Sequence, residues 1–330
     1  MPKSSGQKLR ILKLLEILNR KTDEGHQMTS AELICDLERQ GIEADRKTVY
    51  DDLQALEDSG YDLIRSKGKK GGVRLLSRDF ALSEVKMLVD AVQSSRFITE
   101  SKSRELTKKL GNLVSMHQEK ALARHFYNGN RVKSDNKAIL YAVDAINEAI
   151  NSGTEISFYY WNWNHEKQKV YRHGKQLYTV SPWELTIDDN NYYLIAYDEK
   201  SESLRHYRVD KMANVTPTET PRKGKEKTAH LSLPEYRAPQ FGMFGGESVT
   251  VKIKAPLNLA GVFIDRFGQD VILQKESDEL LTVRTKISPS PQFYGWLFGL
   301  GQGVSVTEPP EIKEEYEKRL QSALDSQRQS

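Results

Sequence analysis

The chain has 330 residues, of which 38% are hydrophobic and 29% charged, and its formal net charge is +3. This length exceeds one ordinary domain and suits two or three, each with a core of its own. No apolar run approaches the roughly 18 to 20 residues of a membrane-spanning helix, and no apolar signal segment follows the N-terminal MPKSSGQKLR. The composition therefore predicts a cytoplasmic protein of several domains.

Two amphipathic helices are predicted in the first 40 residues. The segment QKLRILKLLEILNRK repeats leucine and isoleucine at helical spacing. The second helix begins at TSAE, where Thr29 and Glu32 have the spacing of a capping box, and it ends at Gly41. Cys35 is the single cysteine and lies in the apolar pattern of this helix, so we expect it to be buried and without chemistry.

A third helix and a hairpin complete the predicted N-terminal domain. Asp45 can cap RKTVYDDLQALEDSG, in which Val49, Leu53 and Leu56 form the buried stripe. Residues 62–77 alternate as two short strands joined by a turn rich in glycine and lysine. The turn and its flanks bring basic residues near one another as a wing: Arg65, Lys67, Lys69, Lys70, Arg74 and Arg78. This order of elements is typical of a winged helix-turn-helix, which predicts a DNA-binding domain over residues 1–78.

The side of the third helix opposite its apolar stripe would enter the major groove, where Arg, Lys and Gln can contact phosphates and base edges. The predicted DNA contacts are Ser30, Arg46, Lys47, Thr48, Tyr50, Asp51, Gln54, Lys67, Lys69 and Lys70. The alternative is that these charges form only a solvated helix face and a solvated hairpin. Asp51 and Asp52 oppose phosphate binding and would face either a base amino group or a partner chain.

Residues 79–134 are polar and helical, which predicts a connector or dimerisation element. A homodimer would suit a palindromic operator. From residue 135 a further helix leads into a β-rich region, in which EISFYYW, QLYTVSPWELTID, NYYLIAYDE and SLRHYRVDKMANV alternate apolar and polar residues between turns. This region predicts a small antiparallel sheet or barrel.

The β-rich region resembles the WYL domain of bacterial transcriptional regulators. The similarity lies in VSPWEL at 180–185, NYYLIAYD at 191–198 and LRHYRVDKM at 204–212. The tripeptide Trp-Tyr-Leu that names the family is replaced here by Tyr192, Tyr193 and Leu194. The resemblance implies an SH3-like β-barrel over residues 135–222, preceded by a winged helix-turn-helix and followed by a C-terminal extension (WCX).

The C-terminal residues 223–330 supply that predicted extension. Independently of the family, residues 248–325 show strand and helix patterns whose first six members follow the order βαββαβ. This is the order of a ferredoxin-like fold. The whole chain is therefore predicted to be a multidomain α+β protein with a winged helix-turn-helix, a helical connector, an SH3-like barrel and a ferredoxin-like α/β extension.

The resemblance also implies a ligand patch made by Ser181, Trp183, Tyr193, His206 and Arg208. Residues two apart in a strand share a face, so His206 and Arg208 can converge on one anion. Aromatic neighbours could stack a base, which favours a nucleotide or single-stranded nucleic acid as effector. The alternative is that the aromatic residues are core and that Arg208 pairs with a carboxylate such as Asp210.

Signatures of catalysis are not found in the sequence. It has no HExxH, CxxC pair, Walker lysine loop or GxSxG, and its seven histidines are scattered, so no enzyme activity, metal or cofactor is predicted. The sequence favours a ligand-responsive regulator that binds a double-stranded operator. A nucleic-acid-binding accessory protein that recognises single strands or DNA ends, without promoter control, is the alternative.

Overall fold

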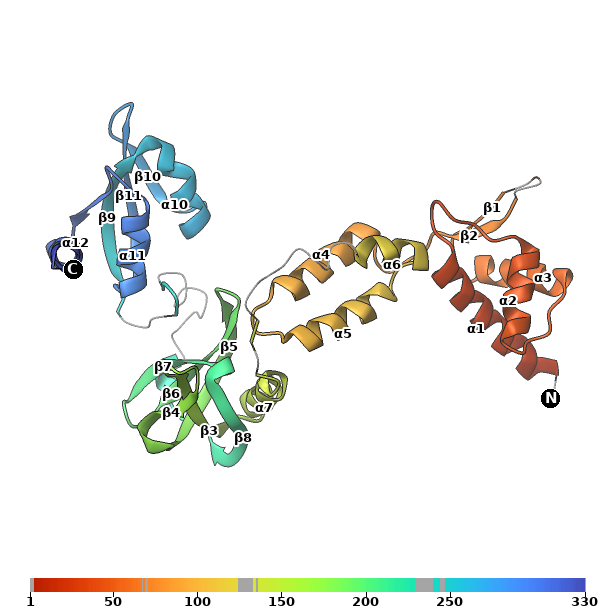
Figure 1. Ribbon diagram of the computed structural model, residues 1–330, viewed down its shortest axis with the longest axis horizontal. Coiled ribbons are helices and arrows are strands. Elements are labelled where there is room, and N and C mark those ends of the chain that lie inside the picture. Colours follow the sequence, from red (N-terminus) through yellow and green to blue (C-terminus); the bar gives the residue numbers. More distant parts are fainter. Residues whose placement is uncertain are drawn as a thin grey trace. The chain divides into compact units, whose positions relative to one another are not determined.

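The computed structural model describes residues 3–66, 68, 71–123, 133–134, 136–228, 240–243 and 247–329 (Figure 1). The chain divides into two compact units, Met1–Lys137 and Ala138–Ser330, and each is described by itself. None of the helices in the described part of the chain is long and apolar enough to cross a membrane.

The first unit begins with three helices and a two-stranded hairpin, as the sequence predicted. Their bounds are α1 (Lys3–Lys21), α2 (Ser30–Arg39), α3 (Arg46–Asp58), β1 (Leu63–Arg65) and β2 (Val73–Leu75). The apolar stripes of the helices meet in one core, where Leu14, Leu33 and Val49 are each 0% exposed. The result is a winged helix-turn-helix-like arrangement.

Both predicted helix caps are confirmed. Thr29 and Glu32 form the capping box of α2, with the Thr29 amide donating to the Glu32 carboxylate at 2.7 Å. Asp45 caps α3 by accepting from the Thr48 amide at 2.8 Å, while the Asp45 amide donates to the Thr48 hydroxyl at 3.0 Å. These bonds satisfy amides that the first helical turn would otherwise leave unpaired.

Three more helices complete the first unit: α4 (Leu82–Ser94), α5 (Glu100–Gly111) and α6 (Met116–Ala123). They enclose a small core that includes Val85, Val89 and Val114. Arg20 of α1 joins them to the first three helices, because its guanidinium donates to the carbonyls of Gly111 and Val114 and to the Glu119 carboxylate at 2.8 Å.

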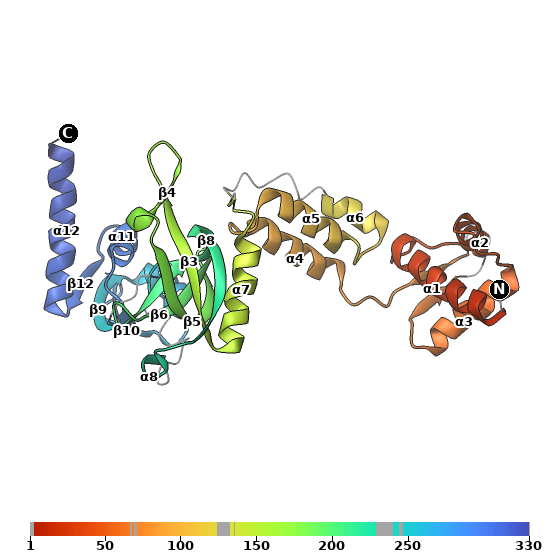
Figure 2. The ribbon, with the colours of Figure 1, turned by 90° about the horizontal axis from the view of Figure 1, so that it is seen from below.

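The second unit starts with a helix and a six-stranded antiparallel sheet. The elements are α7 (Ile139–Ser152), β3 (Thr154–Trp163), β4 (Lys169–Tyr171), η2 (Arg172–Gly174), β5 (Leu177–Asp188), β6 (Asn191–Asp198), β7 (Ser203–Arg208), η3 (Val209–Lys211), β8 (Met212–Pro221) and α8 (Lys225–Thr228). The sheet runs β4-β3-β5-β6-β7, and β8 returns to pair with β3, as in an SH3-like barrel (Figure 2). The sequence pattern ran through 203–215 as one strand, whereas η3 divides it and turns β8 back toward β3.

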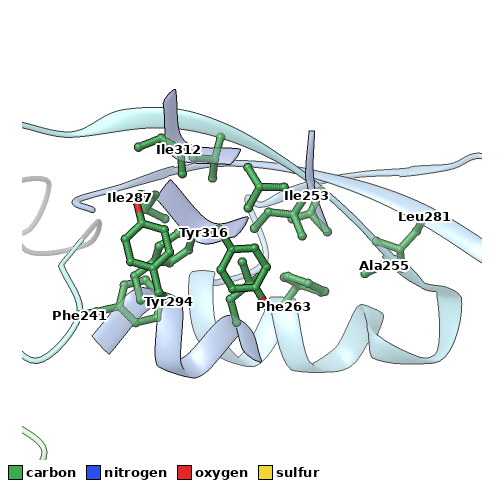
Figure 3. Close-up of a cluster of buried hydrophobic side chains, with 14 residues drawn as sticks. Phe241, Ile253, Ala255, Phe263, Leu281, Ile287, Tyr294, Ile312 and Tyr316 are labelled. Atoms are coloured by element: carbon green, nitrogen blue, oxygen red, sulfur yellow. The ribbon is translucent and has the colours of Figure 1, made fainter. Parts of the chain in front are cut away.

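The C-terminal part has the predicted ferredoxin-like order. Its elements are β9 (Val249–Pro256), η4 (Leu257–Leu259), α10 (Ala260–Phe267), β10 (Ile272–Lys275), β11 (Leu280–Ile287), α11 (Pro291–Gly299), β12 (Ser305–Glu308) and α12 (Pro310–Arg328). The antiparallel sheet has the order β10-β11-β9-β12. Side chains from the strands and from the helices meet in one core, with Ile253, Leu281 and Phe263 among them (Figure 3).

Candidate DNA-binding face and ligand patch

The exposed face of α3 carries five of the predicted DNA contacts. Its side chains are Arg46, Lys47, Tyr50, Asp51 and Gln54, all exposed, while Val49, Leu53 and Leu56 on the opposite face are buried as predicted. Tyr50 is 57% exposed although it is aromatic. The face therefore offers two cations, a carboxylate, an amide and a ring to solvent.

Thr48 and Ser30 are placed differently from that face. Thr48 is half-buried, and its hydroxyl bonds both the amide and the carbonyl of Asp45, so it serves the helix cap. Ser30 is the first residue of α2 and is also half-buried. The structure thus separates these two hydroxyl residues from the exposed side chains of α3.

Asp52 contacts its own chain, which corrects the expectation that it faces a base or a partner. Its carboxylate is 1% exposed and receives two hydrogen bonds from the Arg10 guanidinium of α1, at 2.5 and 3.2 Å. The hydrogen bond to Asp52 raises the pKa of Arg10. Asp52 follows Val49 by three residues and therefore lies on the buried stripe, a signal that could have indicated this ion pair.

The arginines around the hairpin bind within the first unit instead of forming a basic surface. Arg65 makes two 2.8 Å hydrogen bonds to Glu57 and lies 4.5 Å from the centroid of the Tyr50 ring. Arg74 donates to the Glu24 carbonyl, and Arg78 donates to the carbonyls of Asn19 and Thr22. These contacts attach the hairpin to the helices.

Three wing lysines, Lys67, Lys69 and Lys70, lie outside the described residues.

Cys35 is exposed, so the expectation that it is part of the core is wrong. Its helix buries Leu33 and Leu37, and Cys35 falls between them on the solvent side.

The strands β5, β6 and β7 bring the predicted ligand residues onto their surface. Tyr193 lies opposite Arg208 in the register of β6 and β7, and His206 lies opposite Ile195. Because side chains alternate along a strand, Tyr193, His206 and Arg208 share one face of the sheet. The family-based prediction of a cluster agrees with this placement for these three residues.

Ser181 and Trp183 lie in β5, before Thr186, which is the residue of β5 that pairs with Tyr193. Both make hydrogen bonds to the segment that follows β8. Ser181 is 1% exposed, donates to Glu155 at 3.2 Å and accepts from the Lys223 amide at 2.8 Å. The Trp183 indole donates to the Lys223 carbonyl at 3.1 Å, with the Arg222 guanidinium 4.1 Å from its ring centroid. Both side chains therefore already have structural partners.

Arg208 is held in an ion pair, as the alternative reading of the sequence expected. It donates to both carboxylate oxygens of Asp210, at 3.0 and 2.9 Å, and to the Asn191 side-chain oxygen at 2.9 Å. Burial opposes its charge, but Asp210 outweighs burial, and the pKa of Arg208 is raised. Within the described part of the chain its Nη1 has no hydrogen-bond partner, so one edge of the guanidinium can meet a further anion.

His206 contacts the chain beyond the barrel. Its ring Nδ1 lies within hydrogen-bonding distance of the Met243 carbonyl. Burial lowers the pKa of His206, and the hydrogen bond only partly offsets this effect. A lowered pKa favours the neutral ring, in which Nδ1 donates its proton to the carbonyl.

A set of cations on aromatic rings lies beside Arg208 and was not anticipated. Lys169 and Lys211 each place Nζ 4.5 Å from the Trp161 ring centroid, and Arg172 lies 5.8 Å from that of Tyr160. The Tyr160 hydroxyl in turn accepts a hydrogen bond from the Arg208 amide. The interleaving of Trp and Tyr with Lys and Arg over residues 159–175 was the available signal.

The fold defines a multidomain α+β protein, in which winged helix-turn-helix-like elements precede a barrel-like sheet and a ferredoxin-like domain. Residues 141–217 match the WYL domain and residues 247–324 match the WCX domain. The chain therefore carries a WYL domain followed by a C-terminal WCX domain. In the described residues no group of three histidine, cysteine or acidic side chains could hold a metal ion.

One similar solved structure is proteasome accessory factor B/C (PafBC) of Arthrobacter aurescens. It shares 18% sequence identity, with a TM-score of 0.29. The match covers 97% of this chain and 49% of that one, so this chain spans about half the length of PafBC. Comparison with curated proteins gave no match.

Proposed function

We propose that this protein is a homodimeric transcriptional regulator that binds a double-stranded DNA operator through α3 and senses an anionic ligand with its WYL domain. The observation that carries the proposal is the exposed face of α3, where Arg46, Lys47, Tyr50 and Gln54 stand opposite a fully buried stripe. An α-helix with such a face fits the major groove. The wing residues Lys67, Lys69 and Lys70 would add attraction for phosphates.

Ser30, Thr48 and Asp51 complete the proposed DNA contacts with smaller roles. Thr48 and Ser30 lie near the N-termini of α3 and α2, where backbone amides favour a phosphate. Asp51 is exposed beside Lys47 and would accept from a base amino group. Asp52 is excluded from these contacts by its buried pair with Arg10.

The test of DNA binding is fluorescence anisotropy on duplex from the chain's own upstream region and on a scrambled duplex, in a salt series. We expect a preference for the upstream duplex that persists as salt weakens the electrostatic part. Arg46→Gln should weaken binding and, if the side chain contacts a phosphate, reduce the salt slope by about 1. Lys86→Gln on α4 is the matched control. Equal binding to both duplexes in every salt would contradict a local operator.

For the ligand, we propose a nucleotide or single-stranded nucleic acid at Ser181, Trp183, Tyr193, His206 and Arg208. The unpaired edge of Arg208 and the nearby cations Lys169, Lys211 and Arg172 support an anionic ligand, and the half-buried ring of Tyr193 could stack a base. Arg208→Ala should abolish binding of a labelled single strand while the fold is kept. Unchanged affinity would contradict the patch.

The same cations near Arg208 favour one second candidate, an accessory protein that binds single strands or DNA ends and controls no promoter. A footprint on duplex DNA separates the two functions. The regulator protects one symmetric duplex site, whereas the accessory protein protects none.

A further inference from the structure

The segment 240–243 contacts both parts of the second unit. Phe241 is 4% exposed and packs in the WCX core, with its ring centroid 5.3 Å from that of Phe293. Two residues later, the Met243 carbonyl bonds His206 of the WYL sheet. Arg266 of α10 donates to the Gln240 carbonyl at 2.8 Å. The segment is thus fixed to the WCX domain and to the ligand patch.

This segment approaches the face of the sheet that carries the patch. Ile195 lies opposite His206 in the register and on the same face as Tyr193, yet it is 0% exposed. Arg266 also interacts electrostatically with Asp188 at the end of β5. The segment therefore reaches the sheet at His206, one same-face row of paired residues away from the row that joins Thr186, Tyr193 and Arg208.

Two buried polar side chains have no partner there. Gln240 is 5% exposed, and neither its oxygen nor its nitrogen makes a hydrogen bond to any residue that the structure describes. Thr186 is 4% exposed, and its hydroxyl also makes no hydrogen bond to any residue that the structure describes. A buried amide without partners is destabilising, and such groups in folded proteins commonly mark a ligand or ordered water.

We propose that Gln240 is a specificity-determining residue of the ligand patch, and that its amide reads the edge of a nucleobase held over Tyr193 while Arg208 holds a phosphate. An amide offers a donor beside an acceptor, which matches adenine at N6 and N7. The ligand is then an adenine-bearing nucleotide strand. Because Phe241 is the next residue, this contact also links the occupied patch to the WCX core. The proposal rests on the proposed ligand sensing.

The experiment uses the full chain and two fluorescein-labelled single strands of twelve nucleotides, oligo-deoxyadenylate (dA12) and oligo-deoxythymidylate (dT12). Binding is measured by anisotropy titration. The wild type should prefer dA12. Gln240→Met keeps the side-chain volume and should weaken dA12 binding by about fivefold or more, with less effect on dT12. Without probe, this variant should have a raised Tm, because it removes a buried unpaired amide. Gln269→Met, at an exposed position, is the control and should change neither quantity.

The outcomes distinguish the two proposals. If Arg208→Ala abolishes binding but Gln240→Met binds dA12 and dT12 as the wild type does, the ligand patch stands and the role of Gln240 is overturned; a buried water would then pair the amide. If the wild type binds neither probe, or Arg208→Ala binds both normally, the proposed ligand patch fails and the role of Gln240 fails with it. A Tm of Gln240→Met below that of the wild type, measured without probe, would also overturn the assignment of an unpaired amide.

Discussion

Single buried charges determine how the N-terminal unit holds α3 against α1. The carboxylate of Asp52 is 1% exposed and its partner Arg10 is 14% exposed, so the pair is almost entirely shielded from water. Removing one member of such a pair leaves the other charge buried without compensation. Asp52 therefore contributes to the placement of α3 without belonging to the proposed DNA-binding face of that helix.

We expect Asp52→Ala to lower the free energy of unfolding of the N-terminal unit by about 3 kcal/mol. Urea unfolding followed by circular dichroism measures this change. Asp51→Ala, one residue away but exposed, is the matched control and should leave stability nearly unchanged. Similar losses of unfolding free energy in both variants would show that the ion pair of Asp52 with Arg10 does not stabilise the unit.

His206 should make the second unit sensitive to mild acid. Its pKa is lowered in the folded protein by burial, so below pH about 6.5 the unfolded chain binds a proton that the folded chain does not. The stability is complete above that pH and falls as the pH decreases toward the folded pKa. His206→Gln keeps a donor for the Met243 carbonyl and should remove this part of the loss in Tm between pH 7.5 and 5.5. An unchanged loss would contradict a neutral His206.

At the scale of elements, most predictions that depend on neighbouring residues are confirmed, although Cys35 is exposed and η3 divides the strand predicted over 203–215. The capping box at Thr29, the helix cap at Asp45, the buried stripe of α3 and the βαββαβ order all arise from short-range patterns, and the structure confirms them. The partners of Arg10 and Arg78 lie 42 and more than 50 residues away. The spacing of Asp52 from Val49 indicates a buried carboxylate, but no local spacing identifies its partner Arg10 or the carbonyls that Arg78 contacts, because only the packing of α1 brings these groups together.

The candidate site shows the same division. Alternation along one strand was sufficient to predict that His206 and Arg208 share a face, whereas Tyr193 was added by the family resemblance and joins them through the pairing of β6 with β7. Gln240 and Met243 come from a segment beyond β8 whose course depends on the packing of Phe241 in the WCX core. Their approach to His206 had no signal in the sequence.

The cap of α2 provides a test at this scale. Thr29→Ala removes the hydroxyl that accepts from the Glu32 amide at 3.3 Å, and it should lower the stability of the N-terminal unit by about 1 kcal/mol. Thr29→Ser keeps the hydroxyl and should lose much less. Chemical denaturation of the three proteins side by side measures the difference; equal losses for Ala and Ser would mean that the methyl group, and not the cap, supplies the stability.

At the scale of the whole molecule, each unit has a core of its own. Leu14, Leu33 and Val49 belong to a core within Met1–Lys137, while Ile253 and Phe263 belong to one within Ala138–Ser330. A ligand in the second unit can alter DNA binding by the first only if it binds two arrangements of the chain with unequal affinity. The proposed regulation therefore requires the covalent connection, whereas the two binding activities do not.

Separating the chain between residues 137 and 138 tests this division. We expect each fragment to unfold in a cooperative transition of its own, since each keeps its buried core. The fragment 1–137 should retain the preference for the upstream duplex, with weaker affinity if dimerisation needs the second unit, and the fragment 138–330 should bind the labelled single strand like the full chain. Adding the single strand should change duplex binding of the full chain but not of a mixture of the fragments. An effect of equal size in the mixture would show that the coupling does not pass through the chain between the units.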